Sequence, residues 1–146
     1  MQYTTVLTAG YHPLPVPGVF AVTVTATPAT LGALLAAAGA AIPVYSDKSL
    51  PASSPIANRF PRHVIFQSTG GNADSIYITW DGQTAPNSTP NPVVGWELTP
   101  GGYVKFEDGY ALLENAINGG HILPDNDTAF QFVADAETAL NVIFSD

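Results

Sequence analysis

A chain of 146 residues, 46% of them hydrophobic, is long enough to bury the core of one domain. It has no cysteine, which excludes disulfides and thiol catalysis, and its 4 basic and 12 acidic residues give a net charge of −8 that disfavours nucleic acid as a partner. Only 11% of its residues are charged, against about 25% in an ordinary domain. Two explanations are open: an assembly buries much of the surface, or the chain is simply an acidic β domain whose surface consists mostly of uncharged residues.

Residues 1–18 are predicted to form an extended arm. Pro13, Pro15 and Pro17 alternate with other residues, and each proline fixes an extended backbone and lacks the N–H that a central strand needs. An exposed arm this apolar favours association, so we expect it to pack on a neighbouring subunit of an assembly through Tyr3, Val6, Leu7, Tyr11, Leu14 and Val16. The alternative is an arm folded along an edge of the chain's own sheet.

A strand and a short helix are expected next. Residues 19–26 alternate and are rich in Val and Thr, which is typical of a strand. Thr27-Pro28 is a typical helix start and Gly39 a typical helix end, so the helix is predicted over about residues 28–38. Its apolar face carries Leu31, Leu34, Leu35 and Ala38. The apolar run over residues 31–42 is too short to cross a bilayer, so we expect no membrane partner.

The rest of the chain predicts more strands and loops. Residues 43–62 form a proline-rich loop that we expect to contact a partner or a substrate, and residues 84–94 form a second exposed loop. Alternating segments predict strands at residues 63–67, 75–80, 103–107, 130–134 and 139–144. In the second of these strands, Ile76, Ile78 and Trp80 share one face. Closely spaced short strands indicate that residues 19–146 form a single β-sandwich domain.

Residues capable of catalysis or metal binding do not form a recognisable motif. His12, His63 and His121 lie in three different contexts, and none belongs to a pair with metal-ligand spacing. A metal-dependent cupin-like enzyme using His63 and His121 is therefore a minor alternative. Asp81 and Glu97 resemble a glycosidase pair only in being two carboxylates separated by a loop. No nucleophile elbow or phosphate-binding glycine loop is present, so we expect no enzyme, no cofactor and no metal.

Four aromatic residues leave a second function open. Tyr77, Trp80, Trp96 and Tyr103 flank the polar 84–94 loop. The four residues could form an aromatic platform for a sugar. Alternatively, Trp80 and Trp96 pack in the hydrophobic core, and we favour this second interpretation.

The segment from Asp74 to Val104 resembles a pattern of small structural proteins of tailed phages. In that pattern a strand of the Ile-Tyr-Val type precedes a polar loop and then a Gly-x-x-Leu-x-Pro-Gly-x-x-Val run. Here these parts are Asp74-Ser75-Ile76-Tyr77-Ile78-Thr79-Trp80-Asp81-Gly82 and Gly95-Trp96-Glu97-Leu98-Thr99-Pro100-Gly101-Gly102-Tyr103-Val104. The strands at residues 130–134 and 140–144 are similar to the closing pair, so the resemblance covers residues 63–146.

The resemblance implies a jelly-roll-like β-sandwich that works as a capsid decoration, or cement, protein. Its partners would be the major capsid protein and further copies of itself, with a trimer favoured. Because the N-terminus has neither a basic segment nor a long apolar core, we expect synthesis in the host cytoplasm and then incorporation into the virion. A carbohydrate-binding or receptor-binding module of a phage head or tail is the alternative.

Overall fold

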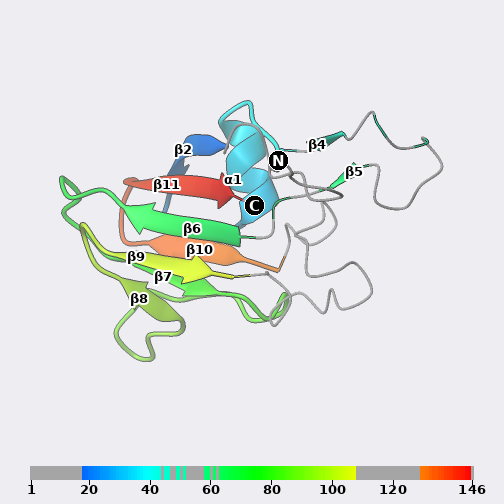
Figure 1. Ribbon diagram of the computed structural model, residues 1–146. Helices are drawn as coiled ribbons and strands as arrows, with labels where there is room; N and C mark the ends of the chain where they lie inside the picture. The colour runs from blue at the N-terminus through cyan, green and yellow to red at the C-terminus, as the bar shows by residue number, and fades with distance from the viewer. Residues whose placement is uncertain are drawn as a thin grey trace.

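The computed structural model describes residues 18–43, 45–46, 49, 51, 58–59, 61, 63–107 and 129–145. Two four-stranded antiparallel sheets form a sandwich with one short helix (Figure 1). The first sheet contains, in spatial order, β2 (Val19–Val24), β11 (Thr138–Ser145), β6 (His63–Ser68) and β9 (Tyr103–Phe106). The second contains β3 (Ala29–Thr30), β10 (Gln131–Ala134), β7 (Ile76–Thr79) and β8 (Trp96–Leu98). A separate short ladder pairs β4 (Tyr45–Ser46) with β5 (Asn58–Arg59).

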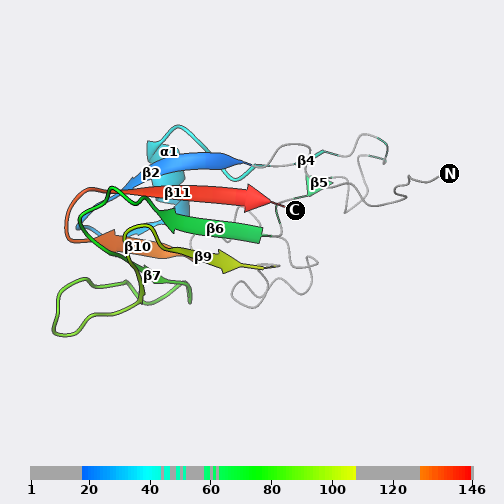
Figure 2. The same ribbon diagram turned by 60° about the vertical axis from the view of Figure 1, so that its left-hand side comes forward.

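The strand order is that of a jelly roll. Among the described strands of the two large sheets, the first along the chain pairs with the last, and pairing then proceeds inward: β2 with β11, β3 with β10, β6 with β9, and β7 with β8. These four pairs fall alternately in the first and the second sheet. Figure 2 turns the first sheet toward the viewer, with parts of β10 and β7 behind it. The predicted β-sandwich is therefore confirmed.

Strand alternation places the core between the two sheets. In β6, every second side chain is buried, as expected when one face of a strand meets the opposite layer. Phe66 is the centre of the core, and its ring meets those of Phe130 and Phe132 edge-on with centroids 5.0 and 4.9 Å apart. Because Phe66 belongs to the first sheet and Phe132 to the second, these contacts join the two layers.

The helix begins later than the sequence predicts. It covers Leu31–Ala37, and Thr30 rather than Thr27 is its N-cap, accepting a hydrogen bond from the Ala33 N–H at 3.1 Å. The reason is that residues 29–30 pair with β10 as the edge strand β3, which keeps them extended. The helix ends at Ala37, one residue before the predicted end at residue 38. Gly39 follows with a left-handed φ of 72°, which favours glycine after a helix. The buried leucines of α1 pack against β2 and β3, which are edge strands of the two sheets.

Several predictions concern residues outside the described ranges. The arm contacts Tyr3, Val6, Leu7, Tyr11, Leu14 and Val16 are all among them, as are His12 and His121. Of the predicted arm, Gly18 is described, and its carbonyl accepts a hydrogen bond from Phe144 N–H at 2.7 Å. Among the described helical residues, none belongs to a helix long and apolar enough to cross a membrane.

Candidate functional site

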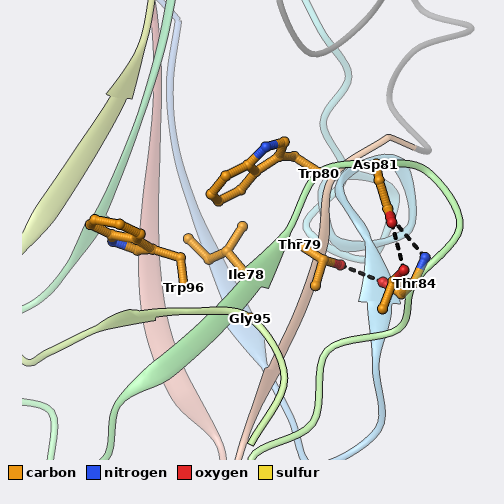
Figure 3. Close-up of a pocket in the computed structure, with 7 residues that line it drawn as sticks. All are labelled: Ile78, Thr79, Trp80, Asp81, Thr84, Gly95 and Trp96. Atoms are coloured by element: carbon orange, nitrogen blue, oxygen red, sulfur yellow. Dashed lines mark hydrogen bonds between the residues drawn. The ribbon is translucent and has the colours of Figure 1, made fainter.

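A hollow of about 390 Å³ opens beside β7 and β8, at the side of the sandwich where β8 is the edge strand. We call it the β8-edge pocket. Figure 3 shows its residues, with Trp80 and Trp96 on either side of Ile78 and with Asp81 and Thr84 in the turn that follows β7. Its lining residues are Ile78, Thr79, Trp80, Asp81, Thr84, Gly95 and Trp96.

The two tryptophans of the pocket have different surroundings. Trp80 is half-buried, and its ring packs against Phe106 of the opposite sheet with centroids 5.3 Å apart. Trp96 lies opposite Ile78 in the β7–β8 register, two residues before the buried Leu98, so alternation places it on the core-facing side of β8. It is nevertheless 55% exposed. The prediction that Trp96 packs in the core is therefore wrong, whereas Trp80 does pack against the core.

Gly95 sets the position of Trp96. Its φ is 125°, and a Cβ added to it would come within 3.0 Å of the Ile78 carbonyl oxygen and 3.2 Å of the Ile78 nitrogen. A glycine here lets the backbone that enters β8 lie directly against β7. The preceding loop is also held, because Asn87 and Val94 exchange two backbone hydrogen bonds of 2.9 Å. A glycine directly before an aromatic strand residue is the sequence feature that marks this site.

Asp81 organises the turn that forms the polar wall of the pocket. Its Oδ1 accepts hydrogen bonds from the N–H groups of Gln83 at 2.9 Å and Thr84 at 2.8 Å, and its Oδ2 accepts one from the Thr84 hydroxyl at 2.5 Å. These hydrogen bonds, led by that of the Thr84 side chain, lower the pKa of Asp81 to about 2. The Thr79 hydroxyl donates to the Thr84 carbonyl at 2.5 Å, which ties the turn to β7.

The four aromatic residues of the predicted sugar platform do not all converge. Trp80 and Trp96 line the pocket, whereas Tyr77 lies on the other face of β7, where it pairs with Glu97. Burial first, and then the carboxylates of Glu97 and Asp135, raise the pKa of Tyr77. Tyr103 begins β9 in the other sheet and is 69% exposed.

Among the described residues, the structure does not bring together either of the two catalytic sites considered from the sequence, the carboxylate pair and the histidine metal site. Asp81 borders the pocket, but Glu97 lies on the opposite face of β8 and accepts a hydrogen bond from the Ser75 hydroxyl at 2.8 Å. His63 begins β6 and pairs in register with Ser145, and its proposed partner His121 lies outside the described ranges. Within those ranges, no group of three His, Cys, Asp or Glu side chains is placed to hold a metal ion.

A second candidate surface is the outer face of the first sheet. It consists of the side chains that point away from the core: Val19, Ala21, Thr23, Ala139, Asn141, Ile143, Ser145, His63, Ile65, Gln67, Tyr103 and Lys105. The register places Val19, Ile143 and Ile65 side by side across three strands, so apolar groups form a row on this face. Val19 is 63% exposed and Tyr103 69% exposed, so the face is accessible at both edges.

The outer face carries little charge on a strongly acidic chain. None of the outward-facing positions on its four strands is Asp or Glu, although Glu107, directly after β9, places a carboxylate beside them. Lys105 is near one edge and pairs with Glu107, with 3.2 Å between Nζ and Oε1. The side chains of Lys105 and Glu107 are 40% and 69% exposed, so water screens this ion pair and it adds little to stability. The part of the face away from the β9 edge can therefore be buried against another protein without desolvating any carboxylate of its own strands.

The chain matches no protein-family model, and no curated protein and no solved structure is significantly similar to it.

Proposed function

We propose that this chain is a non-enzymatic structural protein of a virus particle, a capsid decoration protein that bridges and stabilises capsid subunits. The observation that carries the proposal is the outer face of the first sheet, where the apolar row formed by Val19, Ile143 and Ile65 is free of carboxylates. The outward-facing positions of β2, β11 and β6 hold no Asp or Glu, so this part of the described sheet is suited to burial against another subunit.

The proposed partners are the major capsid protein and other copies of this chain, with a trimer as the expected assembly. Burial of apolar area would stabilise such contacts by roughly 25 cal/mol per Å² before the costs of association are subtracted. The jelly roll supports the proposal by analogy, because this architecture recurs in viral capsid domains. The resemblance of residues 63–146 to small structural proteins of tailed phages points the same way.

The test places a charge on the outer face. Val19→Asp introduces a carboxylate at an exposed position of the edge strand β2, and Val93→Asp introduces one at another exposed valine, in the 84–94 loop. Both proteins are mixed with capsid shells that lack the decoration protein and are sedimented. We expect Val19→Asp to weaken shell binding by about tenfold or more, because the new carboxylate must be desolvated, and Val93→Asp to leave it unchanged.

Light scattering of the isolated protein provides the second measurement. A homo-oligomer, with a trimer expected, supports the proposal. A stable monomer that does not sediment with shells would contradict it, as would equal shell binding by the two aspartate variants.

A further inference from the structure

We infer that the β8-edge pocket binds a neutral sugar, with the apolar face of a pyranose ring against Trp96 and a sugar hydroxyl donating to Asp81. This role goes beyond the proposed structural function, because the pocket lies beside the second sheet whereas the proposed capsid contact uses the outer face of the first. A particle protein with both surfaces would bind the shell through the outer face and a glycan through the pocket.

The aromatic part of the pocket provides the stacking surface. Trp96 is 55% exposed although it occupies a core-facing position, so its indole is available to a ligand. Trp80 is held by its contact with Phe106 and forms the second aromatic wall (Figure 3). The C–H groups of one pyranose face carry partial positive charge and are complementary to the negative face of an indole ring.

The polar wall of the pocket selects a ligand that donates hydrogen bonds. The hydroxyl hydrogens of Thr79 and Thr84 are already donated, to the Thr84 carbonyl and to Asp81, so these hydroxyls have only acceptor capacity left. Asp81 is ionised at neutral pH, as an ordinary aspartate is, and its hydrogen bonds in the turn favour the ionised form further. An ionised carboxylate only accepts hydrogen bonds. Sugar hydroxyls are the matching donors.

Charge argues against both ionic classes of ligand. An acidic sugar or a phosphate would face the Asp81 carboxylate on a chain of net charge −8, and no basic residue lines the pocket. A full cation is also poorly matched, because the Asp81 carboxylate already accepts three hydrogen bonds and no second carboxylate lines the pocket. A sugar hydroxyl needs only one acceptor position, and about one of the four positions of the Asp81 carboxylate is left. The volume of about 390 Å³ lies in the range of small-molecule sites.

The test measures glycan binding by the intact chain. An array of neutral and acidic glycans identifies ligands, and calorimetric titration with a neutral oligosaccharide from the array gives affinities for three variants. Trp96→Ala removes the stacking surface, and Asp81→Asn removes the charge but keeps an acceptor for the turn. Tyr103→Ala is the matched control, because Tyr103 is an exposed aromatic residue on the other sheet.

We expect Trp96→Ala to lower the affinity by about tenfold or more, Asp81→Asn to lower it less, and Tyr103→Ala to leave it unchanged. In the wild-type protein, bound glycan should also protect tryptophan fluorescence from acrylamide, a readout that does not depend on any variant folding. Absence of neutral glycan binding, a preference for acidic glycans, equal affinity of Trp96→Ala and wild type, or no protection from acrylamide would each overturn the inference. None of these results bears on shell binding, which is measured separately.

Discussion

The side-chain amide of Asn72 pairs with the backbone of Ala139 as a neighbouring strand would. Its Nδ2 donates to the Ala139 carbonyl at 2.7 Å, and its Oδ1 accepts from the Ala139 N–H at 3.2 Å. The same Nδ2 also donates to the Ser68 hydroxyl at 2.8 Å. One side chain in the turn after β6 thus satisfies both backbone groups of a residue near the start of β11.

Replacing this amide is expected to destabilise the fold. Asn72→Ala leaves the Ala139 N–H and carbonyl without these partners, and we expect the free energy of unfolding to fall by about 1–2 kcal/mol. Urea denaturation measures the change. Asn141→Ala is the control, because its amide makes one long contact of 3.4 Å with Gln67 on the outer face, and we expect a change within about 0.5 kcal/mol. Equal losses in the two variants would contradict the role assigned to Asn72.

Gly95→Ala should destabilise the protein and disturb the β8-edge pocket. The new Cβ would lie 3.0 Å from the Ile78 carbonyl oxygen at a φ of 125°, so β8 must move away from β7. We expect a loss of about 1–3 kcal/mol in thermal or urea unfolding, together with a changed tryptophan emission spectrum. Gly71→Ala is the matched control, because nothing lies within 4 Å of its added Cβ. A stable Gly95→Ala variant with unchanged emission would show that the close approach is not required.

Phe66→Ala is expected to be among the most damaging single substitutions. The side chain is fully buried, and it contacts aromatic rings from both layers of the sandwich. Removing it leaves a cavity at the centre of the core, which should lower the free energy of unfolding by about 3–5 kcal/mol. Tyr103→Ala, on the exposed outer face, serves as the comparison and should change stability by less than about 0.5 kcal/mol. The prediction fails if both variants unfold at similar urea concentrations.

The Asp81 turn should make a pH-dependent contribution to stability. The pKa of Asp81 falls from its ordinary 3.8 to about 2 because hydrogen bonds favour the ionised form in the folded state. The sign follows from this direction: the stabilisation is present above the ordinary pKa and is lost as the pH falls through the lowered one. We therefore expect wild type to melt at a higher temperature than Asp81→Asn near pH 6, and the difference to shrink below pH 3.8 and to vanish only below about pH 2. A difference that stays constant over this range would exclude the linkage.

Local patterns were sufficient to predict most of the strands. Strands such as β2, β6 and β11 alternate with period two over several residues, and this alternation reflects burial of one face. The start of α1 was missed because Thr27-Pro28 and Thr30 are both acceptable N-caps. The helix starts after Thr30 because residues 29–30 pair with β10 and stay extended. β10 is distant in sequence, so no local pattern shows this pairing.

The candidate site was less accessible to prediction, because its exposure depends on tertiary structure. The sequence pattern identified Trp80 and Trp96 as notable but favoured burial for both. That Trp96 lies at the open edge of the second sheet follows from strand order, which no local pattern contains. The sequence pattern named Asp81 only as one of two carboxylates, and its position beside the pocket results from the hydrogen bonds that fold Gln83 and Thr84 back onto it.

The pairing of β2 with β11 also has a consequence for the order of folding. Val22 of β2 pairs with Leu140 of β11. During synthesis, β2 therefore has no β11 to pair with until nearly all of the described residues have been added to the chain. Until then its uncharged Val-Phe-Ala-Val-Thr-Val edge is open to association with other nascent chains. Because each pair further inward closes a shorter loop, β7 and β8 are positioned to form first and β2 and β11 last. The first sheet, which carries the outer face, would then be completed only after β11 has been synthesised.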